Sequence, residues 1–341
     1  MTMRIYKIHP GRGIDSLELH NVRPRTPGAD EVRVRVRAAS LNYRDLMVAK
    51  GTYLVSGDQA VVPMSDASGE VVEVGSAVTR FKTGDRVITS FFPNWIDGEP
   101  TPEKTAGALG AGADGVLAEE LVLNERAFVR IPNGLDDVEA STLTCAGLTA
   151  WNSFFQSAHL RPGDSVLLLG TGGVSIWALQ LAKAAGLRSI ITSSNDAKLS
   201  RASALGADAT INYRSNPEWQ DEVLRLTDGR GVDLVMEVGG AGTFARSVSC
   251  TRMGGSVAVI GGVSGFGGEF RPFDLIGGAR KMIGIFVGNR TGLEQLVRFT
   301  DLAGIHPVVD RVFAFDEARE AYAHLESGQH FGKVVIRVAD H

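Results

Sequence analysis

A glycine-rich turn near the middle of the chain has the residue types of a phosphate-binding element. The segment Gly-Thr-Gly-Gly-Val-Ser, residues 170–175, follows an apolar run typical of a buried strand and precedes apolar residues at helical spacing. Such glycines permit a tight turn, and the helix start offers free N–H groups to a pyrophosphate. The sixth position, Ser175, replaces the usual Gly or Ala, and a plain strand–helix turn is the alternative. The expected cofactor contacts are Gly170, Gly172, Gly173 and Val174.

The end of the next strand, predicted over residues 189–192, favours one nicotinamide cofactor over the other. An acidic residue there would bind a ribose 2′-hydroxyl. The chain instead has Ser193 and Ser194, with Lys198 on the following helix, and these suit a 2′-phosphate. We interpret Asp196 as the cap of that helix, and a solvated helix face is the alternative role for Lys198. The pattern favours NADP(H) over NAD(H).

The elements around this turn predict an α/β fold with two parts. Up to about residue 130 short strands indicate a barrel-like β domain: residues 31–37 show period-2 alternation, and 86–89 follow a Gly-Asp turn. From about residue 134 strands alternate with helices, which predicts a parallel, doubly wound sheet. We therefore expect a catalytic domain over 1–130, a dinucleotide-binding domain over 131–275, and a C-terminal segment, 276–341, that completes the first.

Composition and charge exclude several classes of protein. The 341 residues are 44% hydrophobic and 22% charged, which is ordinary for a globular protein. The formal net charge of −4 and the absence of a Lys/Arg run predict no nucleic-acid or membrane partner. Cys145 and Cys250 are the only cysteines, so no disulfide framework is expected and a cytoplasmic location fits best. We interpret Cys250 as a small buried hydrophobe.

Metal-ligating residues do not cluster in the sequence. The seven histidines are scattered and no Cys-x-x-Cys occurs, whereas zinc sites need such ligands at short spacings. We predict no metal site.

Several motifs together resemble the medium-chain dehydrogenase/reductase superfamily, most closely its zinc-free quinone-oxidoreductase and alcohol-dehydrogenase-like branches. They are Leu-Asn-Tyr-Arg-Asp at 41–45, Pro-Met-Ser-Asp at 63–66, residues 71–75, residues 81–87, residues 145–151, the glycine turn, and Phe-Gly-Lys-Val-Val at 331–335. The resemblance implies a Rossmann domain inserted into a GroES-like catalytic domain. It also implies a homo-oligomer, either a dimer or a tetramer.

The resemblance implies further site residues and one departure from the family pattern. Positions that bind the catalytic zinc in relatives correspond to Asn42, Ser65 and Cys145, which supports a zinc-free enzyme. The implied cofactor contacts near the nicotinamide or its ribose are Asn42 and Thr149, and those at the 2′-phosphate are Tyr213, Ser194 and Lys198. Gly239 and Gly261 would lie along the adenosine half and the nicotinamide ribose, and Lys333 would reach toward the pyrophosphate. The contacts implied at the carboxamide edge are Val287, Gly288, Asn289 and Arg290. The alternatives are an exposed strand aromatic for Tyr213 and a solvated charge for Lys333.

Without zinc, the substrate must be activated by hydrogen bonding and positioning. We expect Asn42 and Tyr43 to line the site and Asp45 to orient its neighbours. Tyr43, Tyr53, Arg44 or a water molecule could donate to the developing negative charge. The leading hypothesis is an NADPH-dependent reductase of quinones, enones or other activated carbonyl compounds. The alternatives are a zinc-free alcohol dehydrogenase or carbonyl reductase, and an NADPH-binding structural or RNA-binding protein with little turnover.

Overall fold

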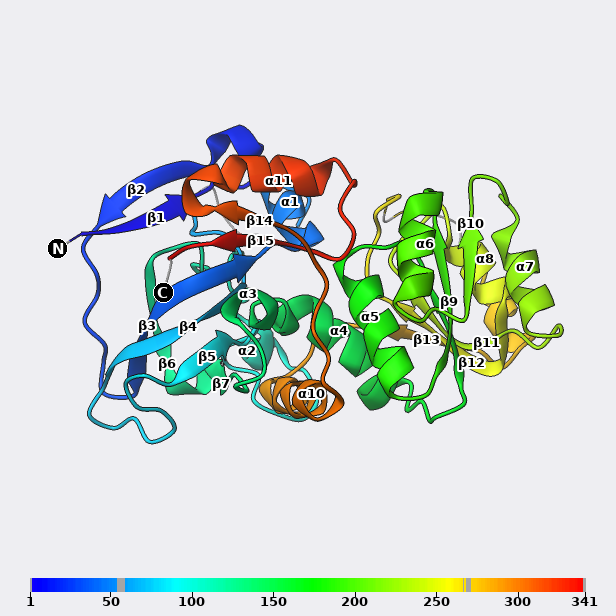
Figure 1. Cartoon of the computed structure of the whole chain (residues 1–341), viewed down its shortest axis with the longest axis horizontal. Helices are drawn as coiled ribbons and strands as arrows, with labels where there is room; N and C mark the ends of the chain where they lie inside the picture. Colours follow the sequence, from blue (N-terminus) through cyan, green and yellow to red (C-terminus); the bar gives the residue numbers. More distant parts are fainter. Residues whose placement is uncertain (1, 54–58, 266, 268–270, 340–341) are drawn as a thin grey trace. The chain divides into compact units, whose positions relative to one another are not determined.

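The chain divides into two compact units, which we describe separately. The computed structural model describes residues 2–53, 59–265, 267 and 271–339. Unit 1 combines Met1–Leu148 with Gly288–His341, and unit 2 is Thr149–Val287. Both ends of the chain therefore belong to unit 1 (Figure 1). Among the described residues, no helix has the length and apolar character needed to cross a membrane.

Unit 2 is a six-stranded, fully parallel sheet in the order β10-β9-β8-β11-β12-β13. Its strands are β8 (Ser165–Leu168), β9 (Arg188–Ser193), β10 (Ala209–Asn212), β11 (Val232–Glu237), β12 (Thr251–Val259) and β13 (Lys281–Gly284). The main helices are α5 (Gly173–Ala184), α6 (Asp196–Ala204), α7 (Trp219–Leu226) and α8 (Phe244–Ser249), with the short α9 (Phe273–Ile276) before β13. Helices α5 and α6 cover one face of the sheet, and α7 and α8 cover the other (Figure 1).

This strand order is that of a dinucleotide-binding Rossmann sheet. The chain runs outward through β8, β9 and β10, then returns to the other side of β8 for β11, β12 and β13. Every residue of β8 and β11 is buried, as expected for parallel strands with helices on both faces. The predicted doubly wound sheet is therefore confirmed.

Unit 1 is built on a seven-stranded sheet whose path is β14-β15-β3-β4-β5-β7, with β6 paired to β3. Its strands are β3 (Glu31–Ser40), β4 (Asp66–Val74), β5 (Arg86–Thr89), β6 (Glu120–Asn124), β7 (Phe128–Arg130), β14 (Val309–Ala314) and β15 (Lys333–Arg337), and β1 (Met3–Lys7) pairs separately with β2 (Glu18–Val22). The C-terminal β15 lies antiparallel to β3 and parallel to β14. Residues from the two ends of the chain thus form one sheet.

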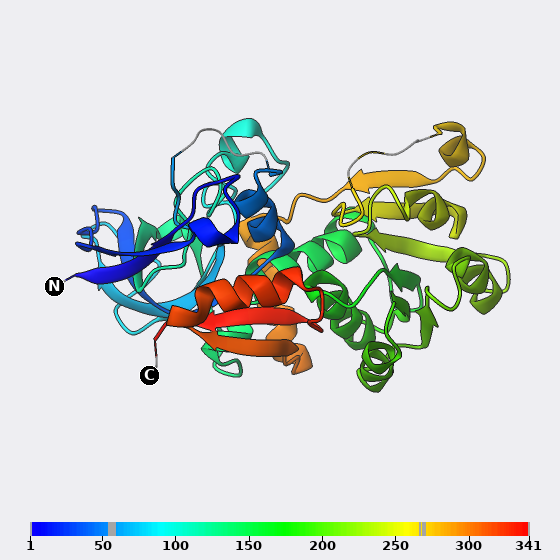
Figure 2. The ribbon, with the colours of Figure 1, turned by 90° about the horizontal axis from the view of Figure 1, so that it is seen from above.

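The helices of unit 1 are short, apart from two near its C-terminus. They are α1 (Tyr43–Lys50), α2 (Pro102–Thr105), α3 (Asp137–Ala140), α10 (Arg290–Ala303) and α11 (Ala318–Glu326). Helix α11 lies along β14 and β15 (Figure 2). A run of helical turns, Leu143–Gly147, Leu148–Trp151 and Asn152–Ser157, links unit 1 to unit 2, and its first and last segments are π-helical.

The units have other boundaries than the predicted domains, which ended at residues 130 and 275. The change from strands to helices near residue 134 suggested the first boundary. However, α3 packs on β3 and β4, so this helical segment stays with unit 1 up to Leu148. At the second boundary, β13 pairs with β12 and so belongs to unit 2.

Helix α1 is absent from the sequence prediction. It spans only eight residues, and both charged residues of its first turn, Arg44 and Asp45, are buried. The carboxylate of Asp45 accepts the N–H of Asn42 over 2.8 Å, which stabilises the helix start. Gly51 ends the helix in the left-handed conformation, with φ 70°. An apolar periodicity cannot reveal a helix whose buried face is partly charged.

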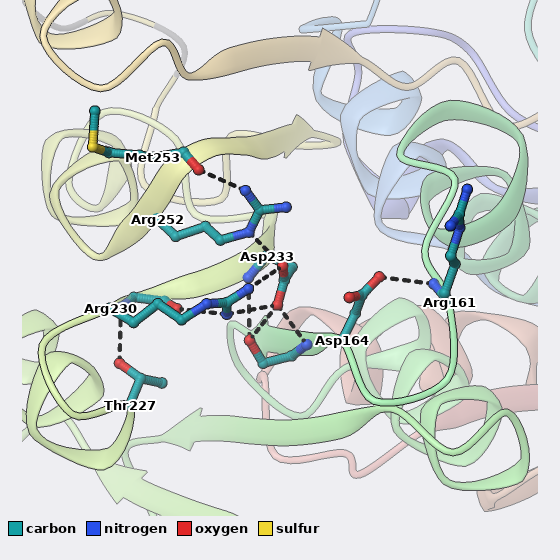
Figure 3. Close-up of polar contacts among 9 residues, drawn as sticks. Arg161, Asp164, Thr227, Arg230, Asp233, Arg252 and Met253 are labelled. Atoms are coloured by element: carbon teal, nitrogen blue, oxygen red, sulfur yellow. Dashed lines mark hydrogen bonds and ion pairs between the residues drawn. The ribbon is translucent and has the colours of Figure 1, made fainter.

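A buried carboxylate on β11 connects this strand to its two neighbours, β8 and β12 (Figure 3). Asp233 on β11 accepts the backbone N–H and the hydroxyl of Ser165 on β8, at 2.9 and 2.8 Å. It also pairs with Arg230 at 2.8 Å and with Arg252 on β12. Burial alone would raise the pKa of Asp233, but the hydrogen bonds from Arg230, Ser165 and Arg252 outweigh it and hold the pKa well below its usual range.

Replacing Asp233 by Ala is expected to destabilise the protein by about 3–5 kcal/mol, because two arginines and Ser165 lose their shared acceptor. Thermal and urea unfolding measure the change. The matched control is Asp274→Ala, which removes an exposed pair with Arg271 at 3.1 Å and should cost less than about 1 kcal/mol. Equal losses in the two variants would contradict this role.

The stability difference between wild type and Asp233→Ala should depend on pH. The folded pKa of Asp233 lies below the unfolded value, so its contribution is complete above about pH 5 and is lost as the pH falls through the folded pKa. The stability gap between wild type and Asp233→Ala should therefore be flat near neutrality and shrink in acid.

Candidate active site

The glycine turn lies at the carboxyl end of β8, between α5 and the neighbouring strands. Gly170 has φ 72°, a left-handed conformation that favours glycine. Its N–H donates to the hydroxyl of Thr192 at 3.2 Å, which fixes the turn to the end of β9. Ser175 is buried and its hydroxyl donates to the Leu169 carbonyl over 2.7 Å, so a serine fits the sixth position.

This turn fits a dinucleotide pyrophosphate. Helix α5 begins at Gly173 with Gly172 as N-cap, and no side chain caps it. Its first N–H groups and positive dipole end therefore lie at the carboxyl end of β8, where the sheet reverses its strand order. A Cβ at Gly170 would have no atom of the described residues within 4 Å, so space is open beside the turn.

The end of β9 carries the residues predicted to bind a 2′-phosphate. Ser193 is buried and its hydroxyl accepts the N–H of Asn195 at 3.4 Å, whereas Ser194 is half-buried. Asn195, not Asp196, caps α6, because its side chain accepts the N–H of Lys198 at 3.1 Å. The interpretation of Asp196 as the cap was therefore wrong: it is the first helical residue.

Two further side chains, Asp196 and Tyr213, bear on the predicted 2′-phosphate contacts. The Asp196 carboxylate accepts from the Asn212 amide at 2.7 Å. Tyr213 follows β10 and is 41% exposed. That exposure agrees with either the exposed aromatic or the phosphate contact, so the role of Tyr213 stays a prediction.

A buried carboxylate missed by the sequence analysis shapes the loop after β11. Glu237 is fully buried and accepts the N–H groups of Gly239 and Gly240 at 2.7 and 2.9 Å. It also accepts the hydroxyls of Thr243, at 2.6 Å, and Ser247. A Cβ at Gly239 would lie 2.3 Å from the Thr243 hydroxyl oxygen, so this position requires glycine. An acidic residue that ends a buried strand before Gly-Gly was the available signal.

The other residues predicted in or next to unit 2 have defined local roles. Gly261 follows β12 and its N–H donates to the Glu237 carbonyl at 3.3 Å. Thr149 is buried, and its carbonyl accepts the Ser153 hydroxyl at 2.7 Å. Val287 has φ 52°, and its carbonyl accepts the Asn152 amide at 2.9 Å. None of these contacts assigns a cofactor role.

The segment that continues into unit 1 starts helix α10. A Cβ at Gly288 would lie 2.9 Å from the Leu148 side chain, so the backbone packs closely there. Asn289 caps α10 by accepting the N–H of Gly292 at 2.7 Å. Arg290 pairs with Glu294 at 3.3 Å. These contacts account for Asn289 and Arg290 locally, and the predicted carboxamide contact stays a prediction.

Lys333 and Asn42 form the most constrained pair in unit 1. The ammonium of Lys333, only 3% exposed, donates to the Leu41 carbonyl and to Asn42 Oδ1, both at 2.6 Å. An ammonium group only donates, so the amide oxygen of Asn42 must face it. Asn42 Nδ2 therefore points away from Lys333, and it is buried with no partner among the residues that the structure describes. The alternative of a solvated Lys333 is wrong, and its pyrophosphate contact stays a prediction.

Asp45 joins Asn42 to Arg44. Its carboxylate accepts the Asn42 N–H at 2.8 Å and pairs with Arg44 Nε at 3.2 Å. Burial raises the pKa of Asp45, while Arg44, the Asn42 N–H and Lys333 act in the opposite direction. The structure thus brings Asn42 and Asp45 together. Tyr43 lies on the same helix but is 43% exposed, outside this buried group.

The residues at the zinc-ligand positions do not fit a zinc ion. Asn42 Oδ1 is held by an ammonium, and the Ser65 hydroxyl donates to Asp66 at 2.6 Å. Asp66 also accepts the N–H of Cys145 at 3.0 Å. Burial, and next the charge of Asp66, raise the pKa of the Cys145 thiol, whereas zinc needs the thiolate. In the part of the chain that the structure describes, no group of three or more His, Cys, Asp or Glu side chains could hold a metal ion.

The fold and these residues define a class of protein. A Rossmann sheet with a glycine turn, joined to a β unit that both chain ends complete, is the fold of nicotinamide-dependent dehydrogenases. Two family models match the chain: the alcohol dehydrogenase GroES-like domain over residues 28–133 and the zinc-binding dehydrogenase model over 173–301.

Similar proteins agree with this class. A zinc-type alcohol dehydrogenase-like protein of Schizosaccharomyces pombe is 43% identical over 92% of this chain and 93% of its own length. A quinone oxidoreductase of Pseudomonas aeruginosa is 31% identical over 95% of this chain and 96% of its own. The solved structure of an NAD-dependent alcohol dehydrogenase is 34% identical, with a TM-score of 0.89 over 99% of this chain and all of that chain. The chain therefore belongs to the medium-chain dehydrogenase/reductase superfamily and is an oxidoreductase.

The raised pKa of Cys145 predicts a slow thiol. Burial shifts the thiol pKa upward, so little thiolate exists near neutral pH. Alkylation of the native protein by iodoacetamide at about pH 7.5, followed by mass spectrometry, should modify Cys145 much more slowly than a cysteine in an unfolded peptide. Cys145→Ser provides the control, because it leaves only Cys250, which is buried in the unit 2 core. Rapid, stoichiometric labelling of native Cys145 would contradict this expectation.

Proposed function

We propose that this protein is a zinc-independent, NADPH-dependent reductase that transfers hydride to a quinone, an enone or another activated carbonyl compound. One observation carries the proposal. The position that holds a zinc ligand in relatives is Asn42, and the ammonium of Lys333 lies 2.6 Å from its Oδ1. A fixed cation there disfavours a metal dication by charge repulsion. Substrate polarisation then depends on hydrogen-bond donors of the chain itself.

The buried residues of unit 1 supply orientation and donors for this chemistry. When bound, the reduced nicotinamide supplies the hydride. Asn42 presents its Nδ2 donors because Lys333 engages its Oδ1. Asp45 fixes the backbone of Asn42 and the guanidinium of Arg44, so we assign it a positioning role rather than proton transfer. Tyr43, which is largely exposed, is proposed to line the site without a buried contact of its own.

The preference for NADPH has its support at the end of β9. That strand ends at Ser193, and the residues that follow are Ser194 and Asn195, so no carboxylate stands in the position that binds a ribose 2′-hydroxyl. The nearest acid, Asp196, is bonded to the Asn212 amide. Ser194, Lys198 and Tyr213 are proposed to contact the 2′-phosphate.

An alcohol dehydrogenase or carbonyl reductase is the second candidate, because one similar protein is named alcohol dehydrogenase-like and another an alcohol dehydrogenase. Family membership also leads us to propose a cytoplasmic homodimer or tetramer without a nucleic-acid partner.

A substrate panel tests the proposed function. Protein dialysed against a chelator is expected to oxidise NADPH with quinones or enones at wild-type rates, and NADH more slowly. Absorbance at the nicotinamide band follows the reaction against enones, quinones, aldehydes and alcohols. A requirement for stoichiometric zinc would overturn zinc independence. Tight NADPH binding without turnover on any compound would overturn the reductase itself.

The Asn42 donor is tested by the isosteric change Asn42→Asp. The variant keeps an acceptor oxygen for Lys333 but replaces the NH₂ donor by a second oxygen. We expect kcat to fall by about 100-fold, as for the loss of one transition-state donor, while the thermal midpoint stays within a few degrees of wild type. Asn124→Asp, at an exposed pair with Asp30, is the control and should leave kcat unchanged. Full activity of Asn42→Asp would rule out the donor role.

A further inference from the structure

Arg44 carries a buried hydrogen-bond donor that meets no acceptor of normal geometry in the described part of the chain. Its side chain is only 8% exposed. Nε pairs with Asp45 at 3.2 Å, and Nη2 donates to the Leu109 carbonyl. The third nitrogen, Nη1, is buried and has no hydrogen-bond partner of normal geometry among the described residues, although a side-chain hydrogen bond with Arg44 also acts on the pKa of Tyr53.

The guanidinium is held firmly, so it cannot turn to satisfy Nη1. Its Cζ lies 4.7 Å from the ring centre of Phe91 and 5.5 Å from that of Tyr53. Gly110, with φ 74°, closes on it: a Cβ there would lie 2.7 Å from Nη2. An unsatisfied buried donor on a charged group costs at least about 1–3 kcal/mol. Such a group in a native structure calls for an explanation, and a catalytic role is one of those known.

The charges around Arg44 decide what kind of acceptor this is. Among the described residues of unit 1, the buried charged side chains are two cations, Arg44 and Lys333, and two anions, Asp45 and Asp66. Electrostatic interactions connect Arg44 to both anions and Lys333 to Asp45. The group is therefore balanced without a ligand. A carboxylate would add an uncompensated buried charge, which is costly, whereas a neutral carbonyl oxygen would not.

We propose that Arg44 Nη1 binds the carbonyl oxygen of a neutral substrate and stabilises the negative charge that reduction places on it. This inference rests on the proposed reductase function. A C–H bond of the reduced nicotinamide breaks, and its electron pair and hydrogen form a new C–H bond on the substrate. The carbonyl π electrons move onto oxygen, where Arg44 donates, and a proton from solvent completes the product. The oxidised nicotinamide leaves.

Tyr53 is suited to complete this oxygen site. Its ring packs against the guanidinium at 5.5 Å. Burial raises the pKa of Tyr53, although Arg44 acts in the opposite direction, so the hydroxyl keeps its proton at neutral pH. Arg44 binds the substrate oxygen in this account, and Tyr53 shapes its surroundings.

Three variants separate this role from a purely structural one. Arg44→Met removes the donor and the charge, and Arg44→Lys keeps the charge without the planar fork. The matched control is Arg80→Met, because Arg80 also stacks on a phenylalanine, at 5.0 Å, and donates to backbone carbonyls in unit 1. The readouts are kcat and KM on the best substrate of the panel, and the primary isotope effect with 4-deuterated NADPH.

We expect Arg44→Met to lower kcat by about 100-fold with little change in KM. The kcat of Arg44→Lys should lie between those of Arg44→Met and wild type, and Arg80→Met should keep the wild-type kcat. The isotope effect should rise in Arg44→Met, because the hydride step then limits the rate. A structural role would lower the folded fraction and leave the isotope effect unchanged. If Arg44→Met does not fold, Arg44→Lys carries the same comparison.

The wild-type protein tests the charge argument without any mutation. Methyl 4-oxopent-2-enoate should be reduced at least about 10-fold faster, in kcat/KM, than the free acid. Preference for the acid would identify a carboxylate site and overturn the neutral-oxygen assignment. If the protein reduces carbonyl compounds but both Arg44 variants keep the wild-type kcat and isotope effect, the role of Arg44 is overturned. The proposed reductase function would still hold. No turnover on any carbonyl compound would overturn both.

Discussion

The buried ammonium of Lys333 is the constraint on which the architecture of unit 1 depends. It joins residues almost three hundred positions apart in the sequence, because it lies on the C-terminal strand β15 and bonds to Leu41 and Asn42 just before helix α1. Burying an ammonium is costly unless acceptors surround it. The two oxygens at 2.6 Å and the nearby charge of Asp45 supply that compensation. The C-terminal segment thus completes both the sheet and the polar centre.

The Lys333 ammonium also fixes the directions in which the neighbouring hydrogen-bond donors of Asn42 and Arg44 point. Asn42 faces Lys333 with its oxygen, so its NH₂ group points elsewhere. Asp45 then holds Arg44, and one guanidinium nitrogen meets no acceptor of normal geometry among the described residues. Preorganised donors of this kind are worth most in a water-poor site, because they need no reorganisation as charge develops. The elements of unit 2 proposed to bind the cofactor, by contrast, depend on backbone geometry at the glycine turn and on the Glu237 carboxylate.

Sequence patterns predicted the elements with strong periodicity and missed those that depend on buried charge. The doubly wound sheet follows from apolar strands alternating with amphipathic helices, and the position of the glycine turn follows from its neighbours. Helix α1 was missed because two residues of its buried face are charged. The buried environment of Lys333 could not be predicted, because its partners Leu41 and Asn42 lie almost three hundred positions away in the sequence. Glu237 was missed although its partners are local, because only its place before Gly-Gly could have indicated it. Short-range capping at Asn195 was misassigned by one residue, since Asn and Asp are equally good caps.

The most direct test of the account follows the hydrogen itself. Metal-depleted protein would be incubated with 4,4-dideuterated NADPH and a neutral enone, and the product analysed by mass spectrometry and NMR. One deuterium is expected on the product carbon that accepts the hydride, and the rate of transfer should be the same with and without added zinc. Absence of deuterium from the product, or transfer only after zinc is restored, would contradict it.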